Sequence, residues 1–382
     1  MNNGSIPVTA FVFGCGVIYC ATATFAQSEP ETDEAASPSH RSITPDVRGD
    51  ELKLKIEKGS FVIVPIPISN PTLDTALVVG AAYFYGQTEE QKKTQPASVI
   101  GGGAMYSTSD SYAVALGQEN YWHEDSWRFA GAIGFADLKL PLLVPDPGGA
   151  QIGADWQVNG GFLYAHLVRK ISGRWYAGGF LRTIDAKQSF SLSLPPADFN
   201  TGGETVASGL GALIQRDSRD MPTNAYSGNY FNLSGLFNNQ TFGSDNNYQS
   251  YSIEYRSYHE LSDRLVFAWE IAGCYRSGTV PLWDACTVGL RGFAATDYLG
   301  KSSAIGQMEA RWRMSERWGV VGFAGGGYLD KRFSNVDDHD LIPSYGIGLR
   351  FMVLKSKRIN IRLDYGRSED SDAIHLSVGE AF

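Results

Sequence analysis

Apolar and polar residues alternate along most of this chain. Residues 358–365 read Arg-Ile-Asn-Ile-Arg-Leu-Asp-Tyr, and residues 374–382 follow a similar rule. A period of two places the two sets of side chains on opposite faces of a β-strand. A soluble sheet turns its apolar face inward, whereas a membrane barrel turns it toward lipid and keeps a polar face toward an aqueous lumen. The choice between these two orientations decides the class of protein.

The same alternation, interrupted by polar turn residues, predicts sixteen strands. They lie at 61–68, 75–85, 98–108, 111–122, 127–138, 155–171, 174–187, 205–217, 226–241, 246–261, 263–276, 302–315, 317–329, 342–354, 358–367 and 373–382.

Connections between these strands alternate in length. Short polar turns occur at 123–126, 171–174, 261–263, 315–317 and 355–357, and the long Pro-, Gly- and Asp-rich segments 139–154, 188–204, 277–301 and 330–341 all fall on the other side. Two connections depart from the rule, because 86–97 is long for a turn and 69–74 is short for a loop.

An even number of strands places both chain ends on the side of the short turns, where the first and last strands can pair. Closure matters because an open edge in hydrocarbon leaves unpaired backbone groups, each costing several kcal/mol. The prediction is an all-β membrane protein, a closed antiparallel transmembrane β-barrel over 59–382. Its last strand is expected to direct one set of side chains to lipid (Ile374, Leu376, Val378, Phe382) and the other to the lumen (His375, Ser377, Gly379).

A soluble alternative is a large periplasmic β-sandwich or a lipocalin-like barrel. It would need neither sixteen strands nor aromatic residues on the outward face, such as Tyr83, Tyr251 and Trp312. Beyond the amino terminus, no run approaches the roughly 18 apolar residues that a membrane helix needs. The membrane barrel is therefore the favoured interpretation.

The amino terminus predicts export. Residues 6–26 are mostly apolar and end with small residues at Thr24 and Ala26, as a signal-peptidase site requires, although no Lys or Arg precedes them. The alternative is a membrane anchor. Residues 1–26 are predicted as a signal peptide, 27–58 as a periplasmic tail, and the location as the outer membrane of a Gram-negative bacterium.

Composition fits this class. The chain has 43 glycines, 12% aromatic residues and a formal net charge of −9. Because half of each barrel strand faces lipid and half faces water, the average composition hides the membrane. The acidic balance argues against nucleic acid. The expected surroundings are outer-membrane lipid and lipopolysaccharide, and no cofactor is expected.

Two of the four cysteines, Cys15 and Cys20, lie in the predicted signal peptide. The other two, Cys274 and Cys286, are expected to form a disulfide in an oxidising compartment. A zinc site is not expected, because no second Cys or His pair lies at ligand spacing.

Three stretches carry more than alternation. The first is the loop motif Leu290, Arg291, Gly292 and Phe293; the second is a charged turn with Asp217, Arg219, Asp220 and Pro222, followed by Gly228; the third is the carboxy-terminal run that includes Gly379 and Phe382. Taken singly, the first is a surface arginine beside a loop glycine and the second is an ordinary charged turn.

In this order and spacing, the three stretches resemble the BamA/TamA-like bacterial surface antigen family, outer-membrane barrels that insert or translocate proteins. The likeness spans roughly 61–382. It implies a sixteen-strand barrel with the Arg-Gly-Phe loop folded into the lumen and a weak seam between strands 61–68 and 373–382. It also implies that the carboxy-terminal run is a signal for the cell's own barrel-assembly machinery.

In that family the loop arginine meets an acidic residue on the lumen wall. Glu309 is the candidate here, because it shares strand parity with Arg311 and lies opposite Met308 in the pattern. The sequence departs from the family at 325–327, where three glycines stand and several relatives carry an Asp.

A second departure concerns the amino-terminal region. Family members that fold or secrete proteins carry periplasmic POTRA domains, and residues 27–58 are too short for one. A separate periplasmic partner is therefore expected, or the barrel has another role.

Two functions are consistent with these residues. One is outer-membrane protein assembly, or protein translocation, through the lumen or the lateral seam. The alternative is a passive pore or structural surface barrel. An enzyme is not expected, because there is no Gly-x-Ser-x-Gly elbow and histidines such as His166, His259 and His375 are scattered along strands that would line a wet wall.

Overall fold

The computed structural model describes residues 59–145, 151–194, 197–332, 341–369 and 371–382. The predicted signal peptide and the predicted tail lie outside these residues. The strands are β1 Ser60–Asn70, β2 Asp74–Phe84, β3 Val99–Ser107, β4 Tyr112–Trp122, β5 Trp127–Pro145, β6 Gln151–Ser172, β7 Trp175–Leu194, β8 Ala197–Asp217, β9 Gly228–Asn238, β10 Tyr248–Ser262, β11 Leu265–Gly278, β12 Cys286–Thr287, β13 Leu299–Arg313, β14 Trp318–Arg332, β15 Ile342–Leu354, β16 Ile359–Arg367 and β17 Asp372–Val378.

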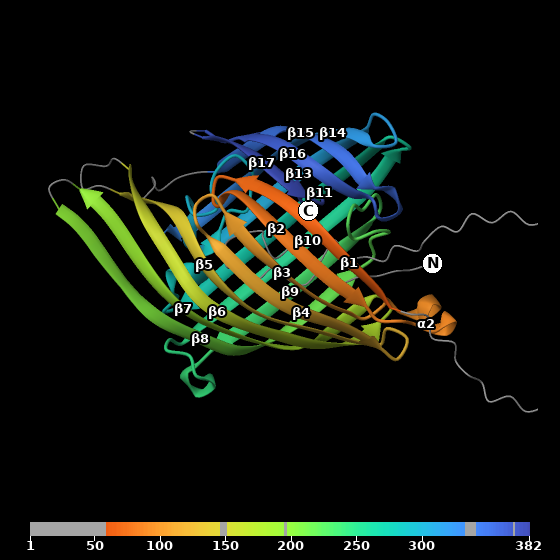
Figure 1. Ribbon diagram of the computed structural model, residues 1–382, viewed down its shortest axis with the longest axis horizontal. Helices are drawn as coiled ribbons and strands as arrows, with labels where there is room; N and C mark the ends of the chain where they lie inside the picture. Colours follow the sequence, from red (N-terminus) through yellow and green to blue (C-terminus); the bar gives the residue numbers. More distant parts are fainter. Residues whose placement is uncertain (1–58, 146–150, 195–196, 333–340, 370) are drawn as a thin grey trace, which may run out of the picture.

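The strands form one closed antiparallel sheet (Figure 1). The two-residue β12 pairs only with β13, while β11 pairs directly with β13 and β17 returns to β1. Removing β12 from the 17-stranded sheet leaves sixteen wall strands. The predicted sixteen-strand barrel is confirmed, and each predicted strand overlaps one of the wall strands. We call the end where β1 begins and β17 stops the terminal end, and the opposite end the loop end.

Large apolar side chains point away from the barrel, as the alternation predicts. Phe61, Trp312 and Tyr345 are exposed, and so are Tyr83 and Tyr251. A barrel in lipid needs this outward apolar surface. None of the helices in the described ranges is sufficiently long and apolar to cross a membrane.

Within the residues that the structure describes, short helices occur only in connections. They are α2 Glu89–Thr94, η1 Gln240–Phe242, η2 Leu282–Asp284 and η3 Lys355–Lys357. Helix α2 explains the long connection at 86–97, and its start is a capping box in which Thr88 and Gln91 bond reciprocally. The spacing Thr-x-x-Gln is the sequence signal for it.

Two of the predicted long loops are mainly strand, which corrects 139–154 and 188–204. Pairing of β5 with β6 continues to Pro145 and Gln151, and pairing of β7 with β8 continues to Leu194 and Ala197. These four strands project beyond β4 and β9 at the loop end (Figure 1). Inward-facing leucines of the projection (Leu138, Leu140, Leu142) are buried with Trp156, so burial favours a strand where Pro and Gly suggest a loop.

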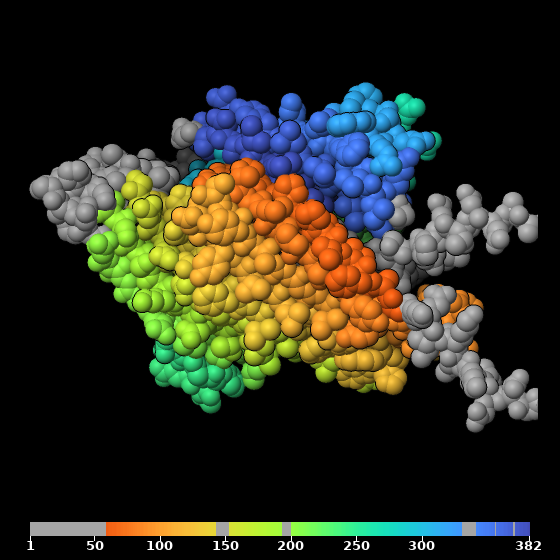
Figure 2. Space-filling view, viewed as in Figure 1, coloured from red at the N-terminus to blue at the C-terminus, as the bar shows by residue number. Residues whose placement is uncertain are grey.

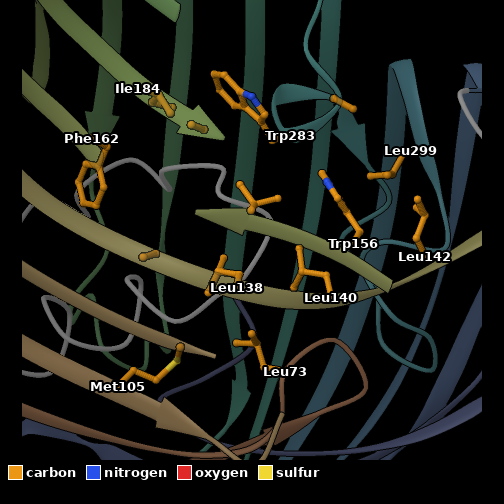
Figure 3. Packing of buried hydrophobic residues seen from close by; sticks show 14 of the residues in the cluster. Leu73, Met105, Leu138, Leu140, Leu142, Trp156, Phe162, Ile184, Trp283 and Leu299 are labelled. Atoms are coloured by element: carbon orange, nitrogen blue, oxygen red, sulfur yellow. The ribbon is translucent and has the colours of Figure 1, made fainter. Parts of the chain in front are cut away.

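Apolar residues also fill one side of the lumen (Figure 3). This apolar lumen cluster includes Ile66, Val78, Trp156, Ile184 and Trp283, all at most 3% exposed. The expectation of a polar, wet lumen is therefore wrong on the side of β1, β2 and β5–β7. His166 illustrates it, because its side chain is buried beside Tyr164, whose hydroxyl lies 3.0 Å from His166 Nδ1.

The chain end corrects the predicted orientation of the last strand. Ile374 is exposed as expected, but β17 stops at Val378 and Gly379 has a φ of +94°. This left-handed backbone turns the chain off the sheet. Phe382 is consequently buried against Tyr258 inside the barrel, and the prediction that it faces lipid is wrong.

Candidate functional site: the lumen loop and its anchors

Residues 279–298 connect β11 to β13 and form what we call the lumen loop. A disulfide joins Cys274 of β11 to Cys286 in the loop, as the sequence predicts. Trp283 enters the apolar lumen cluster, whereas Leu290 and Phe293 pack with Val288 in a separate buried cluster. The loop is thus fixed inside the barrel by a covalent link and by apolar burial.

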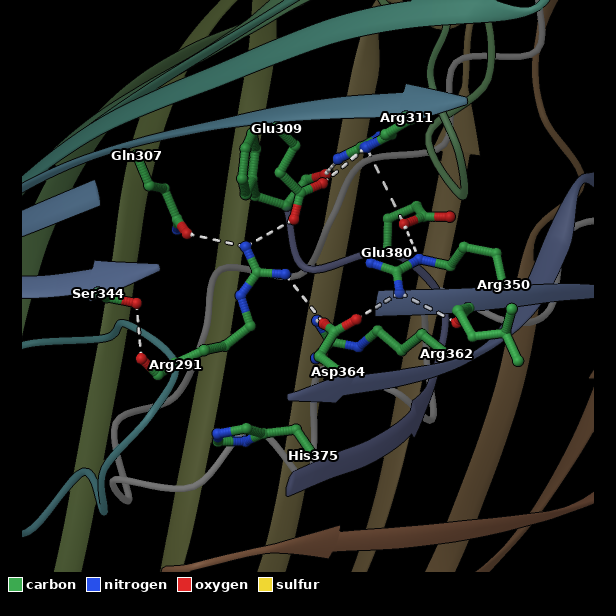
Figure 4. A network of polar contacts seen from close by, with 12 residues as sticks. Arg291, Gln307, Glu309, Arg311, Ser344, Arg350, Arg362, Asp364, His375 and Glu380 are labelled. Carbon is green, nitrogen blue, oxygen red and sulfur yellow. Dashed lines mark hydrogen bonds and ion pairs between the residues drawn. The ribbon is translucent and has the colours of Figure 1, made fainter. Parts of the chain in front are cut away.

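Arg291 is the first charged anchor of this loop (Figure 4). Its Nη2 lies 2.7 Å from Glu309 Oε1 and its Nη1 lies 2.9 Å from Asp364 Oδ2, and all three side chains are almost fully buried. The guanidinium also stacks 3.5 Å from the centre of the Phe323 ring. The predicted pair with Glu309 is present, and its functional role stays a prediction.

Asp364 was missed in the sequence. It is placed by β16, whose alternation puts Asn360, Arg362 and Asp364 on one face. The sequence shows this alternation, but it does not show that Asp364 contacts Arg291, which lies 73 positions away. Asp364 therefore provides Arg291 with a second carboxylate partner, and residues 325–327, which are glycines, provide none.

The backbone of the motif is held as firmly as its side chain. The Ser344 hydroxyl donates to the Arg291 carbonyl at 2.6 Å, and the Gly292 N–H donates to His375 Nε2 at 3.3 Å. A Cβ on Gly366 would lie 2.8 Å from the Gly292 nitrogen, so glycine lets the loop lie directly on β16. Gly292 itself has a φ of +112°.

Around Arg291 the ion pairs continue toward the terminal end. Arg311 Nε lies 2.7 Å from Glu309 Oε2, and Arg350 binds Asp364 and, at 2.8 Å, Glu380. Arg311 Nη2 also donates to the Phe382 carbonyl oxygen at 2.9 Å. The residues after β17 therefore belong to the same polar network as the loop (Figure 4).

Asp284 is a second anchor, which the sequence analysis missed. Its Oδ1 accepts from Arg182 Nη1 at 3.0 Å, its Oδ2 accepts from the Tyr248 hydroxyl at 2.7 Å, and Arg276 Nη2 lies 3.5 Å away. Burial raises the pKa of Asp284, but Arg182 and Arg276 more than offset it, so this pKa lies below its usual range. No sequence motif marks the contact, because Arg182 is 102 positions away.

The two anchors have opposite polarity. Near one end the loop presents a carboxylate to arginines of β7 and β11, and near the other it presents a guanidinium to carboxylates of β13 and β16. A buried charge that loses its partner costs about 3–5 kcal/mol. Sliding or rotation of the loop would break both sets, so the loop has one strongly preferred position.

Residues 218–227 between β8 and β9 form what we call the crossing turn. Arg219 clamps Asp217 with bonds of 3.0 and 2.7 Å and donates to the Pro222 carbonyl at 3.3 Å. Asp220 reaches Arg358 at 2.5 Å, on the far wall. The predicted turn residues thus form a brace across the terminal end of the barrel.

Asp220 is further held by the backbone of its own turn. Its Oδ1 accepts from the N–H groups of Tyr226 and Ser227 at 2.9 and 3.2 Å. Burial raises the pKa of Asp220, but Arg358 and these two N–H groups outweigh it, so the pKa lies below its usual range. The carboxylate is therefore charged at neutral pH.

Gly228, the first residue of β9, follows the crossing turn with a φ of +96°, and an added Cβ would lie 2.2 Å from the Ser218 carbonyl oxygen. We expect Gly228→Ala to lower the free energy of unfolding by more than the roughly 1–2 kcal/mol that a left-handed conformation alone costs. Urea unfolding of the refolded barrel measures it.

Gly243→Ala is the matched control for this prediction. Gly243 has a φ of +87° but nothing within 4 Å of an added Cβ. Its substitution should show the conformational cost alone. Equal destabilisation by both substitutions would contradict the steric role of the close contact at Ser218.

The seam between β1 and β17 is short. The register places Ser69 opposite Leu376, whereas β1 pairs with β2 along its whole length. β1 also contains Pro65 and Pro67, and a proline lacks the N–H that a sheet ladder needs. In Figure 2 the orange surface of β1 and β2 meets the blue carboxy-terminal strands along this line. At the predicted seam, β1 and β17 therefore have little regular strand pairing.

Comparison with known proteins places the fold. Solved structures that it resembles include BamA from Haemophilus ducreyi lacking POTRA domains 1–3, with a TM-score of 0.57 and 14% identity over 84% of this chain and 70% of that one. CdiB from Acinetobacter baumannii gives a TM-score of 0.55 at 12% identity, covering 84% of this chain and 60% of that one. CdiB from Escherichia coli gives 0.51 at 12% identity, covering 85% and 68%.

These three likenesses are too distant to show more than the fold. None of the curated proteins matches the sequence. The model of the Omp85 superfamily domain matches residues 149–382, which is more than half of the chain and includes the lumen loop, the crossing turn and the terminal residues. The chain belongs to the Omp85 superfamily.

Proposed function

We propose that this protein is an outer-membrane barrel of a Gram-negative bacterium that assembles or translocates other polypeptides at the β1–β17 seam. The observation that carries the proposal is the short seam, where the β1–β17 register gives the pair Ser69–Leu376 while β1 pairs with β2 along its whole length. A partly unpaired strand edge is a template for adding another strand. The proposed role involves no catalysis.

Because the lumen is filled, a route at the seam is favoured over a route through a central pore. The lumen loop, the crossing turn and the buried residue Phe382 all occupy the interior, and the two anchors hold the loop there. An ion or solute would have to displace buried charge pairs to pass. The passive pore is therefore the less favoured function, and it is an outcome of the test below.

Partners of this activity follow from the family resemblance. BamA and CdiB are the proteins with similar folds. We expect the barrel to be inserted by the cell's own barrel-assembly machinery, to sit in outer-membrane lipid and lipopolysaccharide, and to receive clients from a separate periplasmic partner.

A disulfide across the seam tests the proposal. The substitutions Ser69→Cys and Leu376→Cys place two thiols at the paired position. In a strain that depends on this protein, oxidation should lock the seam and lower the levels of other outer-membrane proteins or of a secreted client. A protein that works through its lumen would keep its activity and its conductance when locked.

The matched control places the lock inside the first hairpin. Ser69 also lies opposite Thr75 of β2, so Ser69→Cys with Thr75→Cys forms a disulfide that leaves the seam free. Oxidised control protein should retain full activity. Equal loss in both locked proteins would trace the effect to the cysteine at position 69 and count against the seam.

A further inference from the structure

The projection of β5–β8 at the loop end has two strand edges (Figure 1). Beyond the residues that pair with β4 and β9, β5 has a neighbouring strand only in β6, and β8 has one only in β7. The outward residues of the projection, such as Lys139, Asp155 and Lys187, are polar, whereas the large exposed apolar side chains end at Phe135 on β5 and Leu181 on β7. Both edges therefore lie in water rather than in lipid.

The edge on β5 is protected against further pairing. Ser111 Oγ accepts from the Lys139 N–H at 2.9 Å and donates to the Lys139 carbonyl oxygen at 3.3 Å. Alternate residues of an antiparallel strand direct their backbone groups to the same side, so Pro141, Leu143 and Pro145 share this side with Lys139. A proline has no N–H, and prolines are a common means of blocking an edge strand. Only Leu143 keeps a donor there.

The edge on β8 has no such protection. The Asn239 N–H donates to the Ser208 carbonyl oxygen at 3.2 Å and the Asp245 N–H donates to the Val206 carbonyl oxygen at 2.9 Å, so even-numbered residues direct their backbone groups to this side. Positions 198, 200, 202 and 204 continue this side, and within the described part of the chain β8 has no neighbouring strand there. None of the four is a proline, so each has an N–H and a C=O. We call residues 198–204 of β8 the open edge.

The side chains of the open edge leave room for another strand. Residues 200–204 are all exposed, on both faces of β8. An added Cβ on Gly203 would have nothing within 4 Å, so packing within the barrel does not require glycine at this position. Glycine inside a strand often marks a place where another backbone approaches closely. The open edge is therefore accessible along the part whose side chains are described.

Charge selects the kind of strand that fits. Glu204 belongs to the open edge, Asp185 lies opposite Val206 on β7, and the Asp245 carboxylate accepts from the Val206 N–H at 2.7 Å. Lys187 lies opposite Glu204, so three carboxylates and one ammonium leave an excess of two negative charges. A second copy of this chain would bring the same excess, and like charges opposite one another destabilise a strand pair. A partner with basic side chains is favoured instead.

We propose that the open edge binds an extended segment of another polypeptide outside the cell, rich in lysine or arginine, as an added β-strand. The free N–H and C=O groups of β8 would pair with its backbone, and its basic side chains would lie beside Glu204 and Asp185. In strand addition of this kind the main-chain hydrogen bonds give affinity and the side chains give specificity. β8 lies on the opposite side of the closed sheet from the β1–β17 seam, so this inference is independent of what the seam does.

Fluorescence anisotropy of a labelled peptide with the full-length refolded barrel tests the charge preference. The probe is a capped peptide of about ten residues that alternates lysine with threonine, and the comparison peptide alternates glutamate with threonine. At one ionic strength the lysine peptide should bind at least about tenfold more tightly, because opposite charges replace like charges across the strand pair. Glu204→Lys should weaken its binding, whereas Glu90→Lys, the same change at an exposed position of α2, should not. No binding of the lysine peptide, or equal binding of both peptides, would overturn the proposal.

A pair of prolines tests the backbone pairing. Asn200→Pro with Glu204→Pro gives the open edge the proline spacing of Pro141 and Pro145, and it removes two N–H groups that do not face β7. Binding of the lysine peptide should be about tenfold or more weaker than for Asn200→Ala with Glu204→Ala, which removes the same side chains but keeps both N–H groups. Equal binding by the two variants would show that charge alone attracts the peptide, which overturns strand addition. If the proline variant does not fold, the comparison of Glu204→Lys with Glu90→Lys still decides, and equal binding there overturns the site.

Discussion

Replacing Arg291 by methionine is expected to release the lumen loop and to destabilise the barrel by about 3–5 kcal/mol. The substitution keeps a long side chain but leaves Glu309 and Asp364, both fully buried, without the cation they share. Glu309 keeps Arg311 and Asp364 keeps Arg350, but the buried network loses the cation that joins the two carboxylates, and such a loss carries that cost. Urea unfolding of the refolded barrel measures the stability, and planar-bilayer recording should show a rise in conductance as the loop leaves the lumen.

Arg317→Met is the matched control. Arg317 is exposed at the terminal end and donates to the carbonyl oxygens of Met352 and Val353. Its loss should change stability little and leave conductance low. The anchor role of Arg291 would be contradicted if the two methionine variants were equally stable.

A charge exchange sharpens the same prediction. If Glu309 were the sole partner, Arg291→Glu combined with Glu309→Arg would restore the pair. The other contacts change this expectation, because the new carboxylate at position 291 would face Asp364 and the new guanidinium at position 309 would face Arg311. Adding Asp364→Asn should restore part of the stability, because it removes the first of these two repulsions. Full recovery in the double variant would show that Asp364 contributes little.

Much of the wall could be predicted from the sequence because its signals are local. Alternation with a period of two and short polar turns depend on neighbouring residues, and they located all sixteen strands. The projections of β5–β8 were missed because Pro141 and nearby glycines resemble a loop, although Leu138, Leu140 and Leu142 keep the alternation. What decides there is burial against Trp156, which a local pattern does not contain.

Prediction of the site succeeded where a motif marked a residue. It failed for residues that are far apart in the sequence and meet only in the folded barrel. The pairing of Arg291 with Glu309 came from the resemblance to a known family, which the loop motif helps to carry, and from strand parity. The partners Asp364 and Asp284 depend on the register of strands that lie far away in the sequence. The inward turn of Phe382 depends on one backbone angle at Gly379, which alternation ignores.

The apolar lumen cluster was missed for a related reason. In a barrel the inward face is usually polar, so apolar residues of both parities in β1 and β2 gave no clear orientation. The loop explains them, because Trp283 gives these inward side chains a partner to pack against. A plugged lumen can therefore be lined by apolar residues where an open channel cannot.

Replacing Asp284 by asparagine is expected to destabilise the barrel by about 3–5 kcal/mol at neutral pH, as much as the loss of Arg291. Asparagine has the same shape and keeps hydrogen-bonding atoms, so the substitution removes mainly charge. It leaves the buried guanidinium groups of Arg182 and Arg276 together without the carboxylate that neutralises them. Unfolding in urea at pH 7 measures the loss. Asp110→Asn, at an exposed loop position, is the matched control and should change stability little.

The pH dependence separates charge from shape in this second anchor. Because the pKa of Asp284 is lowered in the folded protein, its stabilising contribution is complete above the ordinary value of 3.8 and is lost as the pH falls through the lower folded value. The unfolding free energies of Asp284→Asn and of the unsubstituted protein should therefore converge at strongly acid pH and differ most above pH 5. A constant difference across this range would mean that asparagine fails through its packing, and that the loop is held at this end by Trp283 and the disulfide rather than by the ion pairs.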